Sequence, residues 1–568
     1  MGAPETCTYL DYRQLSDRLQ GFASDYPGLV QLSSIGKSLE GKDIWLLAIT
    51  RLASGAAEDK PALWVDANIH SVELVGSVAA VQFAGLLLEQ AGQREDIDRC
   101  LDRYTIYICP RANPDGAELA LATPPRFVRS STRPWPYNDP VQDGVDTRDI
   151  DGDGRVLTMR IPDANGPWKA SEQEPRLMVR RDPAENGSRY YRLLPEGELR
   201  HFDGVSLPAE KLAENLDLNR NFPARWRGEH EQKGAGAYPA SEPEVRALVD
   251  FVTQHKNICS TVSLHSYSGA LLRPLSYADD DQLPAEDRWV FDQIGRKGTE
   301  LTGYPALSAY HGFRYHPQEV ITGAMDDWAY EQLGCLAWTV ELWSPQRQAG
   351  IDDYHLIEWY RDHPLEDDIK LLKWSDEQLN GAGYIDWYSF DHPQLGPVEL
   401  GGWDLLYSFW NPPVEKLQAE VAPVAEWLLW HALIHPCLDL INPSIDAIDV
   451  DLWRIRAAVQ NIGWLPSDVT KKARKENMVR GVQLELGLND AAELVSGKLC
   501  QEAGQVEGWS HKPVSPFAFG ARPADPSDNL AQAEWVVRAP VGTSVKLTAR
   551  HDRGGSVLRS VSLQTSRD

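Results

Sequence analysis

The feature that most constrains the fold of this chain is a set of short apolar runs that alternate with segments of helical periodicity. The run Ala62–Ala67 is typical of a strand that is covered on both faces. Apolar residues recur at helical spacing from about 74 to 90, and further short runs follow at 104–109, 261–264 and 336–340. This alternation predicts an α/β domain with a mixed, mostly parallel sheet flanked by helices.

The character of the sequence changes after Pro436. The residues beyond it form short alternating segments separated by Gly, Asn and Pro turns, which predict a small all-β sandwich. We therefore expect two domains, 1–438 and 439–568. Two irregular stretches, at about 123–215 and 345–400, are interpreted as insertions in the first domain, because they are too long for plain loops.

The chain has 568 residues and a formal net charge of −27, to which residues 1–440 contribute −28 and residues 441–568 contribute +1. Such a field repels phosphate backbones, which argues against nucleic-acid binding, and it attracts cationic substrates or metal ions. The alternative is that the acidity only keeps the protein soluble. No run of 18 apolar residues exists, so we expect no membrane-spanning helix.

The seven cysteines are scattered and form no CxxC pair, and the N-terminus shows no signal-peptide pattern. These features predict reduced thiols and a cytoplasmic location, or secretion if a leader is absent from this sequence. The sequence leaves the oligomeric state open.

Three segments carry side chains that suit metal chemistry. His70-x-x-Glu73 follows the first apolar run, and an imidazole and a carboxylate at a strand-to-helix junction can bind one metal ion. His265 follows the run 261–264, at the strand end where α/β folds place their sites. The alternatives are a solvated His–Glu pair and a core histidine. Glu341 ends another apolar strand, where a buried carboxylate is costly unless it is paired or catalytic.

The segment Asp217-x-Asn219-Arg220-Asn221 offers donors for an anion. The guanidinium of Arg220 is a planar fork that suits a carboxylate, and Asn219 adds a further donor. The alternative is a turn held by Asx hydrogen bonds.

Six motifs, in this order and spacing, resemble the zinc carboxypeptidases of the carboxypeptidase A/B type. They are Ile35–Lys42, His70-x-x-Glu73, Asn113-Pro114-Asp115-Gly116, Asp217-x-Asn219-Arg220-Asn221, His265-Ser266-Tyr267-Ser268, and Asp327-Trp328 followed by Glu341. The resemblance covers about residues 8–436 and extends to a bacterial branch with an Asp-rich insertion and a C-terminal β-domain.

The resemblance implies a metal centre and a base. His70, Glu73 and His265 would bind Zn²⁺, and Asp217 would orient His70 from behind. Glu341 would act as the general base on a water molecule.

The resemblance also implies how a substrate is held. Asn219 and Arg220 would bind its terminal carboxylate, and Arg129 would stabilise the oxyanion. Arg133 competes with Arg129 for that role, because the insertion blurs the alignment.

Two positions depart from the family pattern or select within it. Glu319 stands where the family has a mobile tyrosine; Tyr310 or Tyr315 could substitute for it, and Glu319 could recognise a cationic group. Asp326 stands at the family's specificity position and resembles carboxypeptidase B, which prefers C-terminal Lys or Arg. The alternative is that Asp326 only caps a helix that starts at Asp327.

The first insertion contains an Asp-rich loop that is interpreted either as a Ca²⁺ site or as a solvated Asx-turn loop. Oxygen donors at loop positions 1, 3 and 5 suit calcium, and they are supplied by Asp149, Asp151 and Asp153. Position 12 is Arg160 instead of a glutamate, so a last ligand would have to come from Asp146 or Asp163.

The function that these features imply is a zinc metallocarboxypeptidase acting on a peptide or peptide-like substrate with a free carboxylate. One alternative is a related zinc amidohydrolase for N-acyl amino acids or peptidoglycan stem peptides. Another is a non-catalytic binding protein, against which the intact ligand set and Glu341 argue. The β-domain contains tryptophans that could form a carbohydrate platform or belong to its core: Trp453, Trp464, Trp509 and Trp535.

Overall fold

The structure is a computed structural model. It describes residues 7–135, 144–187, 189–207, 214, 216–316, 318–352, 354–510, 525 and 527–564.

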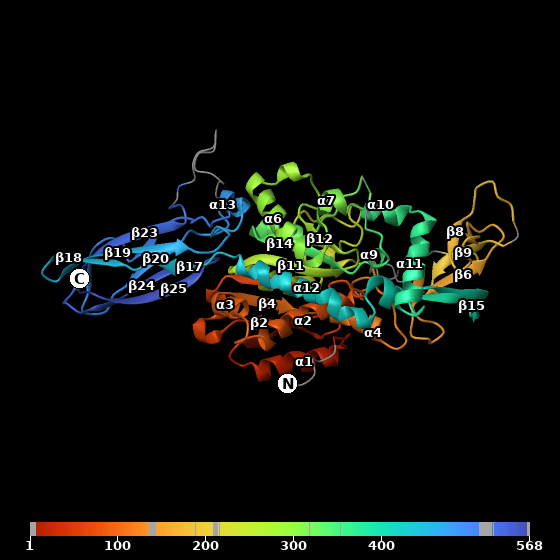
Figure 1. Ribbon diagram of the computed structural model, residues 1–568, viewed down its shortest axis with the longest axis horizontal. Helices are drawn as coiled ribbons and strands as arrows, with labels where there is room; N and C mark the ends of the chain where they lie inside the picture. Colours follow the sequence, from red (N-terminus) through yellow and green to blue (C-terminus); the bar gives the residue numbers. More distant parts are fainter. Residues whose placement is uncertain are drawn as a thin grey trace.

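A mixed eight-stranded sheet forms the centre of the molecule (Figure 1). Its strand order is β1 (Val30–Lys37), β2 (Asp43–Ile49), β4 (Thr105–Cys109), β3 (Ala62–Ala67), β11 (Ile258–Ser266), β14 (Leu336–Leu342), β12 (Ala270–Arg273) and β13 (Ala306–Ser308). The pairs β4–β3, β3–β11, β11–β14 and β12–β13 are parallel, and the other three are antiparallel. The predicted fold class is confirmed.

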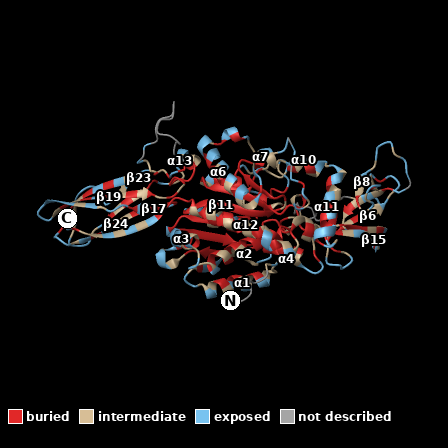
Figure 2. Cartoon of the chain, in the orientation of Figure 1, coloured by how far each residue is buried: buried red, intermediate tan, exposed pale blue. Residues whose placement is uncertain are grey.

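The central strands are apolar because they are covered on both faces. Every residue of β3, β11 and β14 is buried, and Figure 2 shows the sheet as the buried interior of the molecule. The helices around this sheet are α1 (Tyr12–Asp25), α2 (Leu74–Glu89), α3 (Glu95–Arg103), α4 (Pro114–Leu121), α5 (Pro243–Gln254), α6 (Ala285–Thr302), α7 (Ala309–Gly312), α8 (Met325–Leu333) and α12 (Val414–Leu433). Short helical segments are η1 (Leu52–Ser54), η2 (Ala57–Asp59), η3 (Leu218–Arg220), η4 (Asp280–Gln282) and η5 (Leu405–Trp410).

The parallel arrangement brings three strand ends to one edge of the sheet. His265 at the end of β11 is in register with Glu341 at the end of β14, and Leu264 is in register with the last residue of β3. Helix α2 lies closely against β11, since a Cβ added at Gly76 would stand 2.6 Å from the carbonyl oxygen of Leu264. The turn between β3 and α2 is thereby held beside His265.

The two predicted insertions form one structure. A six-stranded sheet runs in the order β15 (Tyr384–His392), β16 (Gly396–Trp403), β6 (Thr158–Pro162), β9 (Tyr191–Pro195), β7 (Trp168–Ala170) and β8 (Met178–Arg180), and it projects at one end of the molecule (Figure 1). Strands β5 (Gly144–Thr147) and β10 (Gly197–Arg200) pair separately. Residues 136–143, 188, 208–213 and 215 of the first insertion lie outside the described residues.

The interpretation of 345–400 as irregular was wrong. Besides β15 and most of β16, this stretch contains α9 (Pro345–Gln348), α10 (Leu356–Arg361) and α11 (Leu365–Gln378). Sequence distance hid the arrangement, because β16 pairs with β6, which is more than 200 residues earlier in the chain.

The last part of the chain is β-rich, as predicted, and contains one short helix, α13 (Lys471–Lys475). One sheet contains β17 (Leu438–Leu440), β19 (Leu452–Asn461), β23 (Leu530–Arg538) and β21 (Glu493–Ser496), with β18 (Ser444–Asp449) beside β19. The other contains β22 (Cys500–Glu502), β20 (Gln483–Gly487), β24 (Ser544–His551) and β25 (Gly555–Ser562). Residues of both sheets form one hydrophobic cluster that includes Trp453 and Trp535, so these two tryptophans belong to the core. Trp509 is 60% exposed, and the domain boundary at 438/439 stays a prediction.

The C-terminal part is attached to the turn between α8 and β14. The buried guanidinium of Arg553 donates hydrogen bonds to the carbonyl oxygens of Leu333 and Gly334, and to the sulfur of Cys335 at 3.3 Å. Ala473 in α13 (Lys471–Lys475) packs against Gly334, because a Cβ added at Gly334 would lie 2.6 Å from the Cβ of Ala473. Strand β14, which carries Glu341 near its end, therefore begins directly after a contact with the β-rich part.

All seven cysteines are free thiols, and all but Cys7 and Cys500 are buried. Among the described residues, none of the helices combines the length and apolar character that a membrane span requires. The cytoplasmic location and the bacterial source stay predictions.

Two buried histidines, His431 in α12 and His435 just after it, make the fold sensitive to acid. His431 is 0% exposed, and neither of its ring nitrogens has a hydrogen-bond partner among the described residues. Burial lowers the pKa of His431 to about 3. The unfolded chain takes up this proton near pH 6.5, so the stabilisation is complete above that pH and decreases as the pH falls toward 3.

We expect the buried, neutral state of His431 to lower the free energy of unfolding at pH 5 by about 2 kcal/mol relative to neutral pH. The decrease is about 1.36 kcal/mol for each pH unit below 6.5. The number of protons taken up on unfolding between pH 6 and 4 should be lower by nearly one in His431→Leu than in wild type. This number is the slope of the unfolding free energy against pH, measured by urea denaturation. His230→Leu is the control, because the side chain of His230 is 81% exposed. An unchanged slope in His431→Leu would contradict the expectation.

Candidate metal centre

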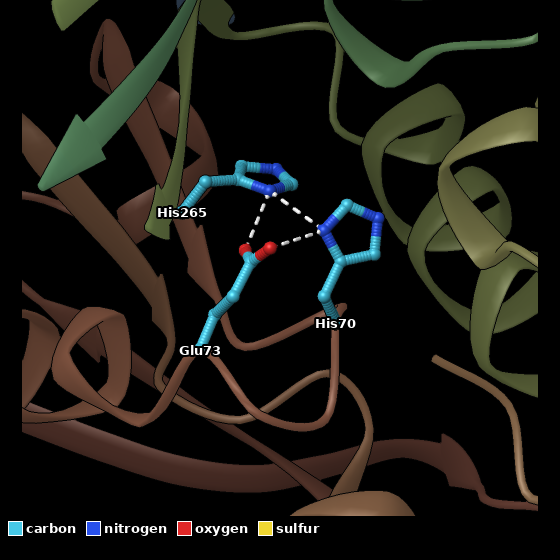
Figure 3. Close-up of side chains that lie close together, drawn as sticks. All are labelled: His70, Glu73 and His265. Atoms are coloured by element: carbon cyan, nitrogen blue, oxygen red, sulfur yellow. Dashed lines mark hydrogen bonds and ion pairs between the residues drawn. The ribbon is translucent and has the colours of Figure 1, made fainter. Parts of the chain in front are cut away.

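Three buried donors converge at the carboxyl edge of the sheet (Figure 3). His70 and Glu73 lie on the turn between β3 and α2, and His265 lies at the end of β11. The Nδ1 atom of His70 is 2.8 Å from Oε1 of Glu73, and Nδ1 of His265 is 2.9 Å from Oε2. The two Nδ1 atoms are 3.2 Å apart. The structure thus brings together the three residues that the sequence selects.

The donor set fits zinc. Zinc–nitrogen bonds are about 2.0–2.1 Å, so two ligand atoms of a tetrahedral ion lie about 3.3 Å apart, close to the separation of the two Nδ1 atoms. Two imidazoles and one carboxylate leave a fourth position, as in catalytic zinc sites. Burial alone would raise the pKa of Glu73, but the two imidazoles lower it to about 2. Glu73 is therefore present as the carboxylate that a metal ion needs.

Asp217 supports His70 from behind. Its Oδ1 lies 3.0 Å from Nε2 of His70, which leaves Nδ1 of that ring directed at the metal position. Its Oδ2 accepts from Nε and Nη2 of Arg129 at 3.3 and 3.2 Å. Burial acts to raise the pKa of Asp217, but the neighbouring His70, Arg220 and Arg129 hold it well below its ordinary value.

His265 has a different support, which the sequence analysis missed. Its Nε2 lies 3.1 Å from Oγ of Ser263, and that hydroxyl lies 2.7 Å from Oδ2 of Asp66. The other oxygen of Asp66 accepts from the indole nitrogen of Trp64 at 2.8 Å. Because the hydroxyl donates to the carboxylate, it accepts from Nε2–H, and Nδ1 of His265 remains unprotonated for a metal.

A cavity of about 900 Å³ opens above the metal centre. Its walls include Arg129, Asn219, Arg220, Asp326 and Glu341, so every predicted substrate or catalytic position meets the same space. Burial, together with the nearby Glu73 carboxylate, raises the pKa of Glu341 well above its ordinary value. Arg133 does not line this cavity and instead pairs with Glu242 at 2.8 Å, which favours Arg129 for the oxyanion role.

Arg220 and Asn219 keep donors free for a ligand. Arg220 is 6% exposed and donates to the carbonyl oxygen of Asn219 at 2.7 Å, but it has no ion pair among the residues that the structure describes. The side-chain oxygen of Asn219 accepts from the backbone of Met325 at 2.9 Å, so its amide group is left to donate. A buried guanidinium without a carboxylate is costly unless a ligand supplies one.

Asp326 does not cap a helix as the alternative interpretation required. Helix α8 begins at Met325 with Ala324 as its N-cap, so Asp326 lies within the first turn. Its side chain is buried, accepts from Asp327 N at 2.9 Å and Thr339 Oγ1 at 3.3 Å, and faces the cavity.

Glu319 and Tyr315 both line the mouth of the cavity, and both are exposed. Tyr310 does not line this cavity; it lines a second, neighbouring one.

The Asp-rich loop brings its three carboxylates together, with ligand atoms within 4.8 Å of one another: Asp149, Asp151 and Asp153. Asp149 already accepts from the backbone of Gly152 and Gly154 at 2.6 and 2.8 Å, in the manner of an Asx-turn loop. Both suggested last ligands are engaged elsewhere, Asp146 with Arg126 and Asp163 with Arg192. The calcium site stays a prediction.

The comparisons with known proteins give the family. Residues 15–358 match the family model described as zinc carboxypeptidase, and residues 437–562 match a domain of unknown function, DUF8731. The first match spans more than half of the chain, so the protein belongs to the zinc carboxypeptidase family. The family supports zinc as the metal of the centre formed by His70, Glu73 and His265.

The relatives are distant. The chain is 26% identical over 341 residues to carboxypeptidase A1 of Mus musculus, covering 59% of this chain and 62% of that protein. It is 26% identical over 331 residues to carboxypeptidase A1 of Sus scrofa, covering 57% and 60%. A solved structure of carboxypeptidase A from Helicoverpa armigera is 18% identical, with a TM-score of 0.38, and the comparison covers 66% of this chain and 75% of that one. The chain therefore spans about three fifths of the length of these curated relatives.

We expect Ser263→Ala to weaken zinc binding by about 10- to 100-fold, because Nε2 of His265 loses its acceptor. The measurement is competition between zinc-free protein and a chromophoric chelator. Ser260→Ala is the matched control, since Ser260 is a buried serine of the same strand whose hydroxyl contacts His435 instead. Equal zinc affinities for the two variants would overturn the role given to Ser263.

Proposed function

We propose that the protein is a zinc-dependent metallocarboxypeptidase that hydrolyses the C-terminal peptide bond of its substrate. The observation that carries the proposal is one cavity that combines the donor triad, the unpaired guanidinium of Arg220 and the carboxylate of Glu341. These are the three parts that an exopeptidase needs: a metal centre, a receptor for the terminal carboxylate and a base.

The terminal carboxylate of the substrate is bound by Arg220 and Asn219. A carboxylate can take two parallel hydrogen bonds from a guanidinium, and the amide of Asn219 is free to donate. This binding fixes which peptide bond lies over the metal centre, and it selects peptides with a free C-terminus over their amides.

The zinc ion, when bound, supplies Lewis acidity toward water and toward the carbonyl oxygen. Glu341 accepts the proton of the attacking water and returns it to the leaving amine. The raised pKa of Glu341 suits a group that must both take up and release a proton. Arg129, held at Asp217 on the cavity wall, donates to the developing oxyanion.

A preference for basic C-terminal residues rests on Asp326. Its carboxylate lines the cavity and would pair with a Lys or Arg side chain of the substrate. Glu319 at the cavity mouth adds a second negative charge in the same space. Tyr315, which also lines the mouth, is placed better than Tyr310 to supply a phenol to the substrate.

We expect wild type to release the C-terminal residue from free-acid peptides and to leave their C-terminal amides intact. Glu341→Gln should lower kcat by at least about 10³-fold at little cost in zinc content, because it removes the proton acceptor and keeps the shape. Product mass spectrometry on paired peptides and metal analysis give the two readouts. Cleavage of N-acyl amino acids without any trimming of peptides would move the assignment to an amidohydrolase.

We expect kcat/KM of wild type to be at least tenfold higher for C-terminal Lys or Arg than for Leu. Asp326→Asn should reduce this ratio by about tenfold or more, because it removes a buried charge opposite the substrate cation. Glu231→Gln, a substitution of an exposed carboxylate that pairs with Arg227 at the rim, is the control. Equal kcat/KM values of wild type for basic and apolar C-terminal residues would contradict the specificity role of Asp326. Asp326 would then serve only through its hydrogen bonds in the first turn of α8.

A further inference from the structure

A second cavity of about 490 Å³ lies beside the catalytic cavity. Three residues line both spaces and form the wall between them: Arg314, Ile357 and Arg361. Residues of α7, α9 and α10 line the second cavity, together with the turn from β11 to β12.

Consecutive residues lead from the metal centre into the second cavity. Ser266 and Tyr267, directly after His265, line the catalytic cavity, whereas Ser268 and Gly269 line the second one. Asn219, Arg220 and Asp326 line only the catalytic cavity, so the second cavity lies outside the pocket for the cleaved residue.

Arg347 is held in position in the second cavity. Its guanidinium carbon lies 5.4 Å from the ring centroid of Tyr304. A Cβ added at Gly269 would be 3.3 Å from Cδ of Arg347, and one added at Gly303 would be 3.1 Å from Nη2. The arginine is therefore packed along its length, and its Nη1 atom is buried without a hydrogen-bond partner among the described residues. Burying such a donor unpaired is costly, and a carboxylate bound to this guanidinium in the cavity would offset part of that cost.

The other two arginines add to the positive charge. Arg314 stacks over Tyr310 at 4.2 Å, and among the described residues neither Arg314, Arg347 nor Arg361 has an ion pair. The cavity also contains Asp352 and Glu358, but these carboxylates are exposed and form no ion pair with the arginines. Ser268, which is 3% exposed, contributes an Oγ atom that has no partner in the part of the chain that the structure describes.

We propose that this second cavity is a subsite for a carboxylate side chain, Asp or Glu, in the part of the substrate that precedes the scissile bond. The inference rests on the proposed function and adds a second specificity: acidic upstream residues combined with the C-terminal residue bound beside Arg220. Guanidinium groups bind carboxylates bidentately, and contacts with Tyr304, Gly269 and Gly303 hold Arg347 in place at the cavity wall.

The test uses short alanine peptides with a common C-terminal residue and one Glu placed second, third or fourth from that end. We expect kcat/KM of wild type to be at least tenfold higher for the best Glu peptide than for the all-alanine peptide. Arg347→Gln and Arg361→Gln should each reduce this ratio about tenfold, mainly through KM, and Arg347→Lys should retain part of it. Arg99→Gln removes an exposed charge of α3, outside both cavities, and should leave the ratio as in wild type.

A binding measurement separates this subsite from the catalytic proposal. Calorimetry on Glu341→Gln should give at least tenfold tighter binding of the best Glu peptide than of the alanine peptide, and Arg347→Gln in that background should abolish the difference. Equal binding of the two peptides would overturn the subsite, whatever the turnover of wild type. Absence of turnover together with this binding difference would overturn only the peptidase assignment.

A free dicarboxylate is the other source of the same chemistry. Glutarate at millimolar concentration should compete with the Glu peptide, and any inhibition of the alanine peptide through the carboxylate receptor Arg220 should be the same in wild type and in Arg347→Gln. Activation or inhibition of the alanine peptide by glutarate, lost in Arg347→Gln, would make the cavity an effector site and overturn its assignment to the substrate.

Discussion

The cost of burying charge inside an apolar sheet is the constraint on which this site depends. The carboxylates of Asp66 and Glu73 and the ring of His265 lie among strands whose residues are all buried. Each is stable there because it has a partner: a hydroxyl and an indole for Asp66, and two imidazoles for Glu73. The Nε2 atoms of the two rings contact Asp217 and Ser263, so both Nδ1 atoms face the Glu73 carboxylate at one point, and the compensation for burial also prepares a metal centre.

The sequence was sufficient for the central strands of the sheet and for the donor triad, but it did not predict the short strands β12 and β13. Continuous apolar runs mark strands such as β3 and β14 because both faces of these strands are covered, and parallel strand ends meet at one edge. His70, Glu73, His265 and Glu341 each follow directly from such a run, so their proximity could be inferred from local pattern and family resemblance alone.

What the sequence could not predict depends on contacts between distant segments. The link from His265 through Ser263 to Asp66 joins two strands, and its only sequence signal was a charged residue inside an apolar run. Strand β16 completes a sheet begun by β6 in the other insertion, so neither stretch looks like a sheet by itself. The second cavity is likewise invisible in the sequence, because Arg314 and Arg347 line the same space only once α7 and α9 are folded beside it.

The contact of Arg553 with the turn after α8 has a consequence for how such proteins can be rearranged. The guanidinium donates to the backbone carbonyl oxygens of Leu333 and Gly334, and the hydroxyl of Thr470 also donates to Gly334. An unrelated module in place of the C-terminal one would have to bring its own donors to this turn or leave both carbonyl oxygens to water. Exchange of modules at this junction therefore favours those that present hydrogen-bond donors, charged or neutral, at the start of the strand that carries Glu341.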